Sequence, residues 1–212
     1  MSFLNRLFGA KDDSTKSEGR LTQRLERLES EAEQAAPAYV GSTYNRAGDL
    51  ALRAGDMERA VGYYGRAIDA FLEDGQREAA RGVANKIIRV RPGALRTLCT
   101  LTWLDLASRH TATALLHLRD YVTAATTVEE NALAANQIFA MARLVPETEF
   151  LEAAADALDG LDLAHRAEEV REWAAEGGSA DALRDTDELA AACLSAAVRT
   201  NERAKMDPRK PR

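Results

Sequence analysis

The apolar residues of this chain recur at intervals of three and four positions, which is the spacing of one face of an α-helix. The clearest pattern flanks the turn Gly55-Asp56. The stripe before the turn comprises Val40, Tyr44, Ala47, Ala51 and Ala54, and the stripe after it comprises Met57, Ala60, Val61, Tyr64, Ala67, Ile68 and Phe71. Small residues in one stripe would face large ones in the other. The pattern therefore predicts two closely packed antiparallel helices.

Residues 41–74 also carry a family resemblance. Counting Gly41 as the first of 34 positions, aromatic, glycine and alanine residues fall at positions 4, 8, 20, 24 and 27, which are Tyr44, Gly48, Ala60, Tyr64 and Ala67. This spacing resembles a tetratricopeptide (TPR) repeat. The resemblance is fair over 75–108, where Gly82 and Ala94 lie 34 residues after Gly48 and Ala60, and degenerate afterwards. It implies a TPR-like α-α superhelix, a solenoid of antiparallel helix pairs that binds a partner protein.

Further helices follow from the same periodicity. A lead-in helix over residues 20–35 carries a narrow leucine stripe. The segment 95–106 is apolar nearly all round, which predicts a central helix packed on both sides. Beyond it we expect a turn at 119–121 and a helix over about 122–144. The remaining expected helices begin near Pro146, after the turn Asp159-Gly160, and near Asp185, and the last is expected to cap the exposed end of the solenoid.

No stretch alternates apolar and polar residues in a β-branched run, so the predicted fold class is all-α. We divide the chain into a short amphipathic segment with a flexible linker (1–19), a TPR-like helical-repeat domain (20–203) and a basic disordered tail (204–212). The linker and the tail are predicted from their polar composition.

The first ten residues carry bulky side chains on one helical face: Phe3, Leu4, Leu7 and Phe8. Two interpretations remain open for them. The segment docks on the protein's own core or is disordered, or it anchors the chain to a membrane surface or a larger assembly.

Charge and cysteine content narrow the function classes. The chain of 212 residues has a net charge of −6, which argues against general nucleic-acid binding. Residues 199–212 hold six basic and two acidic residues, a local charge of +4.

Cys99 and Cys193 are predicted to be buried free thiols of a reducing compartment. Without an apolar run of membrane-spanning length or a secretory signal, the expected location is cytoplasmic, at the inner face of a membrane if the N-terminal segment is an anchor.

Candidate chemistry is sparse. The three histidines are His110, His117 and His165, and no carboxylate or thiol completes a ligand set around the first two. The neighbouring pairs Glu129-Glu130 and Glu168-Glu169 point to different sides of a helix and cannot share a proton. There is no glycine-rich phosphate loop. We therefore assign no catalytic, cofactor-binding or metal-binding residue and expect a protein that is not an enzyme.

The TPR resemblance implies that the first helix of each pair lines a concave face. In this chain that face would offer Asn45, Asp49, Leu52, Arg53, Val83, Lys86 and Ile87 to a helix or an extended peptide. Some TPR proteins clamp a partner's terminal carboxylate with a lysine and an asparagine. Here Asn45 and Asp49 hold those positions, and Asp49 would repel a carboxylate, so the clamp is disfavoured.

The predicted function is a non-enzymatic scaffold or adaptor that holds another protein or peptide in a helical groove. The alternative is an α-helical accessory subunit of a larger complex, in which the apolar helix 95–106 faces a neighbouring protein. No nucleic acid, cofactor or metal is expected.

Overall fold

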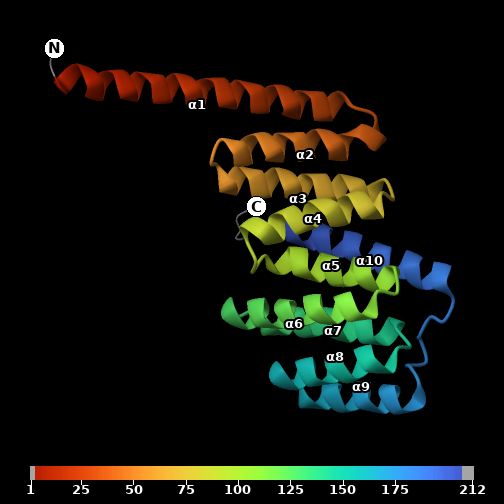
Figure 1. Ribbon diagram of the computed structural model, residues 1–212. Helices are drawn as coiled ribbons and strands as arrows, with labels where there is room; N and C mark the ends of the chain where they lie inside the picture. Colours follow the sequence, from red (N-terminus) through yellow and green to blue (C-terminus); the bar gives the residue numbers. More distant parts are fainter. Residues whose placement is uncertain (1–2, 207–212) are drawn as a thin grey trace. The chain divides into compact units, whose positions relative to one another are not determined.

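The computed structural model describes the backbone of residues 3–206 and the side chains of residues 18–199. In this part of the chain the structure consists of ten α-helices joined by short turns, without a β-strand (Figure 1). They are α1 (Phe3–Gln34), α2 (Pro37–Arg53), α3 (Met57–Glu73), α4 (Arg77–Val90), α5 (Leu95–Ala107), α6 (Thr111–Thr127), α7 (Asn131–Leu144), α8 (Thr148–Gly160), α9 (Ala164–Glu176) and α10 (Thr186–Met206). The predicted all-α class is confirmed.

The chain forms two compact units, Met1–Val83 (the N-terminal unit) and Ala84–Arg212 (the C-terminal unit). The division falls inside α4. None of the described helices is both long and apolar enough to cross a membrane.

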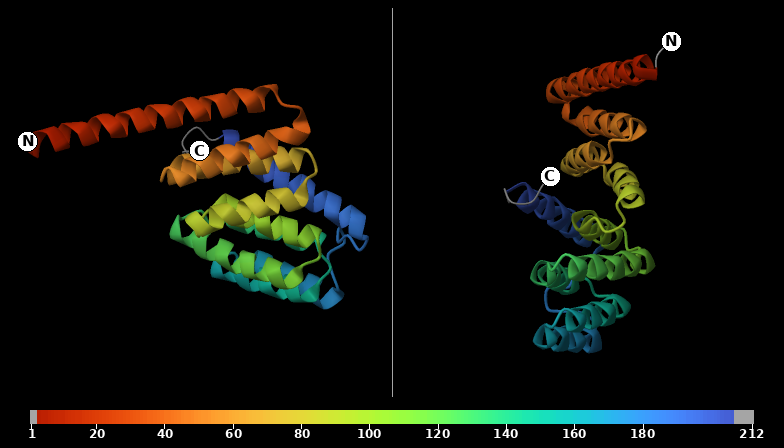
Figure 2. Two further views of the ribbon diagram at one scale, coloured as in Figure 1. Left: turned by 45° about the horizontal axis from the view of Figure 1, so that its top comes forward. Right: turned by 90° about the vertical axis from the view of Figure 1, so that its left-hand side faces the viewer.

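In the N-terminal unit, α2 and α3 form the predicted helical hairpin (Figure 2). Gly55 adopts a left-handed backbone with φ of 83° at the turn, and the Asp56 carboxylate caps α3 by accepting a hydrogen bond from the Arg59 amide at 3.0 Å. Tyr64 and Ala67 have no exposed surface. The predicted packing of small residues against aromatic rings is confirmed in this pair.

Helix α1 packs against α2 and buries Leu25 and Ala32, each 2% exposed. The lead-in helix is therefore confirmed. The helix also runs through residues 11–19, for which composition predicts a flexible linker. This segment contains no proline that would interrupt the helix. The side chains of Phe3, Leu4, Leu7 and Phe8 lie outside the described part, so both interpretations of that segment stay predictions.

In the C-terminal unit, α5 is the central helix. Every residue from Thr97 to Ala107 is buried, and α6 and α10 both pack against it. The expectation that this uniformly apolar helix is covered on more than one side is confirmed.

Helix α10 lies beside α5 and also contacts α7, although we expected it to cap the end of the solenoid (Figure 1). The segment 177–185 returns the chain from α9 toward α5. The Leu183 amide donates to the Leu144 carbonyl at 2.9 Å, and the Arg109 guanidinium donates to the Arg184 carbonyl at 2.6 Å. The capping prediction is thus corrected. An all-round apolar helix such as α5 needs cover on several sides, and α10 supplies part of it.

The helix predicted over 122–144 is two helices. Helix α6 ends at Thr127 and α7 begins at Asn131, while residues 119–121, predicted as a turn, lie within α6. The actual turn contains Glu129, whose φ of 59° is left-handed.

Two smaller predictions also need correction at helix ends. Asp159-Gly160, predicted as a turn between helices, forms the last turn of α8. At the C-terminus, α10 includes residues 204–206, which we predicted to be disordered, whereas 207–212 lie outside the described residues.

Candidate functional site

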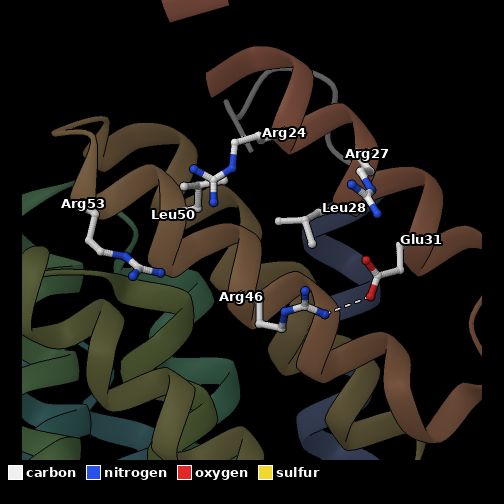
Figure 3. A pocket seen from close by; sticks show the side chains of 7 residues that line it. All are labelled: Arg24, Arg27, Leu28, Glu31, Arg46, Leu50 and Arg53. Carbon is white, nitrogen blue, oxygen red and sulfur yellow. Dashed lines mark hydrogen bonds and ion pairs between the residues drawn. The ribbon is translucent and has the colours of Figure 1, made fainter. Parts of the chain in front are cut away.

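The N-terminal unit contains a surface pocket of about 320 Å³ between α1 and α2 (Figure 3). Seven residues line it: Arg24, Arg27, Leu28 and Glu31 from α1, and Arg46, Leu50 and Arg53 from α2. Their spacings place each group on one helical face, because residues three, four and seven apart lie along the same side of a helix. The contact between the helices through Leu25 and Ala32 brings those two faces together.

The lining is strongly basic. Four arginines and one glutamate give the pocket a formal charge of +3, in a chain whose net charge is −6. Two of the four arginines have hydrogen-bond partners. Arg46 donates to the Glu31 carboxylate at 2.8 Å, and Arg53 donates through Nε to the Asp49 carbonyl at 3.1 Å.

Arg24 and Arg27 form no hydrogen bond or ion pair with another described residue. The Arg46–Glu31 pair is open to water, with side chains 61% and 45% exposed, so it holds Arg46 only weakly. A guanidinium group presents several N–H donors in a planar fork that matches a carboxylate or phosphate. The arrangement can therefore bind an oxyanion.

The residues that we predicted on the concave face have different environments. Asn45, Asp49 and Leu52 are half-buried on α2, and Arg53 is exposed and lines the pocket. The Asp49 carboxylate accepts a hydrogen bond from the Tyr64 hydroxyl at 2.7 Å. Burial and this bond raise the pKa of Tyr64 well above its ordinary value. Asp49 thus contributes to the contact between α2 and α3.

The predicted residues on α4 are largely covered. Val83 and Ile87 are 4% and 2% exposed, and Lys86 is half-buried. Val83 and Ile87 present almost no surface to a partner in this structure. Arg53 is the one predicted residue that lies at the pocket. Arg24, Arg27 and Arg46 were not among the predicted site residues, although their helical spacing is visible in the sequence.

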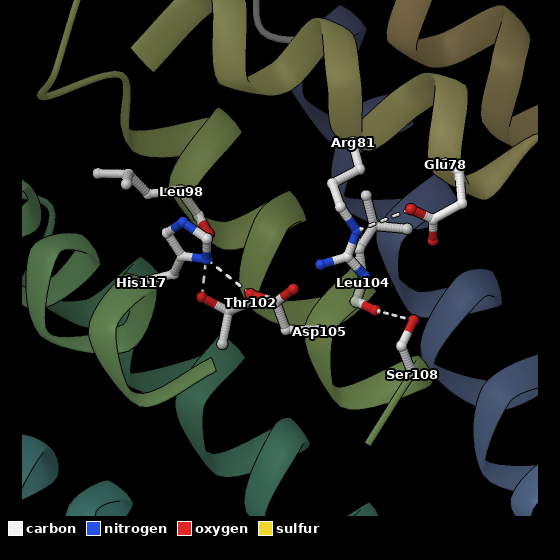
Figure 4. Close-up of polar contacts among 8 residues, drawn as sticks. All are labelled: Glu78, Arg81, Leu98, Thr102, Leu104, Asp105, Ser108 and His117. Carbon is white, nitrogen blue, oxygen red and sulfur yellow. Dashed lines mark hydrogen bonds and ion pairs between the residues drawn. The ribbon is translucent and has the colours of Figure 1, made fainter. Parts of the chain in front are cut away.

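A carboxylate–imidazole pair with a buried carboxylate and a partly exposed imidazole lies in the C-terminal unit (Figure 4). The Asp105 side chain has no exposed surface, and one of its oxygens lies 2.6 Å from Nδ1 of His117. Such a pair can orient a base that activates a nucleophile, and nucleophilic catalysis needs a hydroxyl or thiol within reach of that base. The nearby hydroxyls of Thr102 and Ser108 donate to carbonyls of their own helix, each at 3.0 Å. From the sequence, His117 was weighed only as a metal ligand, and Asp105 was not among the predicted residues.

The two thiols are also part of the packing. Cys99 and Cys193 are both buried, and neither forms a disulfide. Burial, with a smaller effect of Glu147, raises the pKa of the Cys193 thiol to about 12, so it is protonated at neutral pH. Cys99 contacts Oε1 of Gln137 at 3.9 Å, and the Trp103 indole donates to the same oxygen at 3.2 Å. Among the residues with described side chains, no group of three His, Cys, Asp or Glu could hold a metal ion.

Comparisons with known proteins add no assignment. No protein-family model matches this chain, and a search of curated proteins found none similar to it.

Proposed function

We propose that this chain is a non-enzymatic, TPR-like scaffold that binds a partner protein through its N-terminal unit. The arginine-lined pocket between α1 and α2 is its recognition site. A scaffold of this kind binds by shape and charge complementarity on a rigid helical surface. The absence of a disulfide at Cys99 and Cys193 fits a cytoplasmic location, where thiols stay reduced.

The observation that carries the proposal is the pocket with its four arginines. It combines an open hollow, uncompensated charge and multiple hydrogen-bond donors at the surface. Asp105, by contrast, is fully buried and pairs with the partly exposed His117, and both thiols are buried. A surface site of this chemistry supports recognition of another molecule more directly than it supports covalent chemistry.

The accessory-subunit alternative gains no specific support. It depended on the apolar helix 95–106 facing a neighbouring protein. In the structure that helix is α5, and α6 and α10 of the same chain cover it.

Site-specific photo-crosslinking in an extract of the source cells tests the scaffold. A benzophenone amino acid replaces Gln23, an exposed residue of α1 that shares a helix face with Arg27 four positions later. The control carries it in place of Glu152, an exposed residue of α8. We expect discrete protein adducts at position 23 and not at position 152. The same adducts at both positions, or none at position 23, would contradict the proposal.

A further inference from the structure

We propose that the occupant of the arginine-lined pocket is a phosphorylated side chain of the partner protein. This inference rests on the proposed function and specifies the chemistry of the group that the scaffold recognises. Arg24 and Arg27 from α1 would hold the phosphate together with Arg46 and Arg53 from α2.

The charge of the pocket matches a phosphomonoester. A phosphorylated residue carries about −1.5 to −2 charges at neutral pH and three acceptor oxygens. The pocket offers +3 and four guanidinium groups. A single carboxylate would leave most of that charge uncompensated and would accept hydrogen bonds on only two oxygens.

The positions of the arginines support the same ligand. Arg24 and Arg27 are three residues apart on one helical turn, where like charges destabilise each other. An anion bound between them would relieve this repulsion. Figure 3 shows the four arginine side chains spread along the pocket, with Leu28 between Arg24 and Arg27, so hydrogen-bond donors from both helices line the same hollow.

Glu31 is a competitor for the same site. Its carboxylate accepts from Arg46 at 2.8 Å, so Arg46 is partly neutralised while the pocket is empty of anion. A phosphate must displace this interaction or share Arg46 with it. Removing the Glu31 charge should therefore strengthen phosphate binding, whereas removing an arginine should weaken it.

A membrane surface with anionic lipids is the less favoured occupant. Its extended negative surface interacts with the whole chain, whose net charge is −6. A small phosphate group is affected mainly by the local +3 of the pocket, because charges beyond about 10 Å are largely screened at physiological salt. The concave lining also suits a protruding side chain better than a flat headgroup layer.

The test measures binding of the full-length protein to three oriented peptide libraries with fixed phosphoserine, phosphothreonine or phosphotyrosine, each against its unphosphorylated counterpart. NMR signals of the arginine Nε–Hε groups report which arginines the selected peptide contacts. Vesicles of phosphatidylcholine with and without phosphatidylserine provide the membrane arm, measured by co-sedimentation.

Four variants sharpen the experiment. Arg24→Gln and Arg27→Gln should each weaken phosphopeptide binding about tenfold or more, since each removes a charge-assisted hydrogen bond. Glu31→Gln should strengthen it several-fold. Arg77→Gln removes the same charge from an exposed residue of α4 that does not line the pocket, and should change affinity less than twofold. Circular dichroism confirms that each variant is folded.

The proposal is supported if phosphopeptides bind better than the unphosphorylated peptides and the variants change affinity in the stated directions. The NMR signals that change on peptide binding should be those of the pocket arginines. Equal binding of phosphorylated and unphosphorylated peptides would overturn the phosphate inference. Protein adducts at position 23 would still support the proposed scaffold function in that case. Vesicle binding that needs Arg24 and Arg27, without phosphopeptide binding, would also overturn it and assign the pocket to lipid headgroups. A loss of affinity in Arg77→Gln equal to that in Arg24→Gln would show non-specific attraction and contradict a defined site.

Discussion

At the scale of single residues, the hairpin of α2 and α3 depends on two glycines that lie directly under aromatic rings. A Cβ added at Gly48 would lie 2.5 Å from the Tyr64 ring, and one at Gly41 would lie 2.6 Å from the Phe71 ring. These distances are shorter than any normal carbon contact, so the rings fit only because the side chains beneath them are absent. The Tyr64 hydroxyl then reaches Asp49, which fixes the ring.

Gly48→Ala should therefore destabilise the protein. Overpacking a tight contact costs about 1–3 kcal/mol, and the better helix propensity of alanine offsets about 1 kcal/mol of it. Gly62→Ala on α3 is the matched control, because no atom lies within 4 Å of its added Cβ. That variant should gain about 0.5–1 kcal/mol. Urea denaturation followed by circular dichroism measures both, and a stabilised Gly48→Ala would contradict the close ring contact.

The Asp105–His117 pair gives a second prediction at this scale. His117→Ala removes a hydrogen-bond partner from a carboxylate without exposed surface, which should cost about 1–3 kcal/mol. His165→Ala removes an exposed imidazole and should change the free energy of unfolding by less than about 0.5 kcal/mol. Chemical denaturation of the wild type and both variants at one pH measures these changes in the free energy of unfolding. Equal effects would indicate that the pair contributes nothing specific.

At the scale of helices, the turns explain which boundaries the sequence predicts. Gly55 and Gly75 mark the ends of α2 and α3 and adopt left-handed backbones with φ of 83° and 72°. In the C-terminal unit Gly177 adopts the same conformation after α9, but at the turns after α5, α6 and α8 it falls on Arg109, Glu129 and Asp162. Non-glycine residues rarely adopt it, so composition gives no turn signal there. For this reason the α2–α3 boundary was predictable and the α6–α7 boundary was not.

The position of α10 could not be predicted for a related reason. Its stripe of Leu189, Cys193 and Ala197 identifies an amphipathic helix, and all three residues are buried as expected. The stripe does not identify the helix that it faces. Which helix α10 packs against depends on the return segment 177–185 and on the surface of α5 that other helices leave uncovered. Both are properties of the assembled unit.

The burial of Cys193 on α10 makes the folded protein sensitive to alkaline pH. Its pKa is raised from 9.0 to about 12, so its stabilising contribution is complete below pH 9 and lost as the pH rises toward 12. Unfolding releases the thiol proton in that range, which lowers stability by up to about 1.4 kcal/mol per pH unit. Cys193→Ala should lose stability less steeply over the same range. Urea denaturation of both forms tests this.

That comparison isolates the thiol, because the pKa of Tyr64 and that of Tyr121 are also raised by burial but both tyrosines are present in the two forms. Parallel pH profiles for the wild type and Cys193→Ala would show that Cys193 ionises freely and that α10 does not bury it in solution.

At the scale of the whole molecule, charge is distributed unevenly. A chain of net charge −6 concentrates +3 in one pocket of the N-terminal unit. The sequence shows the arginines, yet the pocket exists only because the register of α1 on α2 brings Arg24 and Arg27 close to Arg46 and Arg53. Periodicity predicts the face of each helix but not the pairing of two faces. The site was therefore less predictable than the fold.

The contribution of α1 leads to a prediction for truncated chains. Deleting residues 1–10 removes none of the buried residues described on α1, which begin at Leu25, so the melting temperature should change little. Association with a partner or a membrane should weaken if that segment is an anchor. Deleting residues 1–34 removes Leu25 and Ala32 together with the α1 side of the pocket.

The longer deletion should therefore lower the melting temperature by several degrees and abolish phosphopeptide binding, since it uncovers apolar surface on α2 and removes two of the four arginines. Thermal unfolding followed by circular dichroism and peptide titration of both truncated chains separate the two roles of α1. A large loss of stability in the shorter deletion would show that residues 1–10 belong to the core. Unchanged phosphopeptide affinity in the longer one would show that α2 alone forms the site, because α1 would then contribute neither donors nor shape.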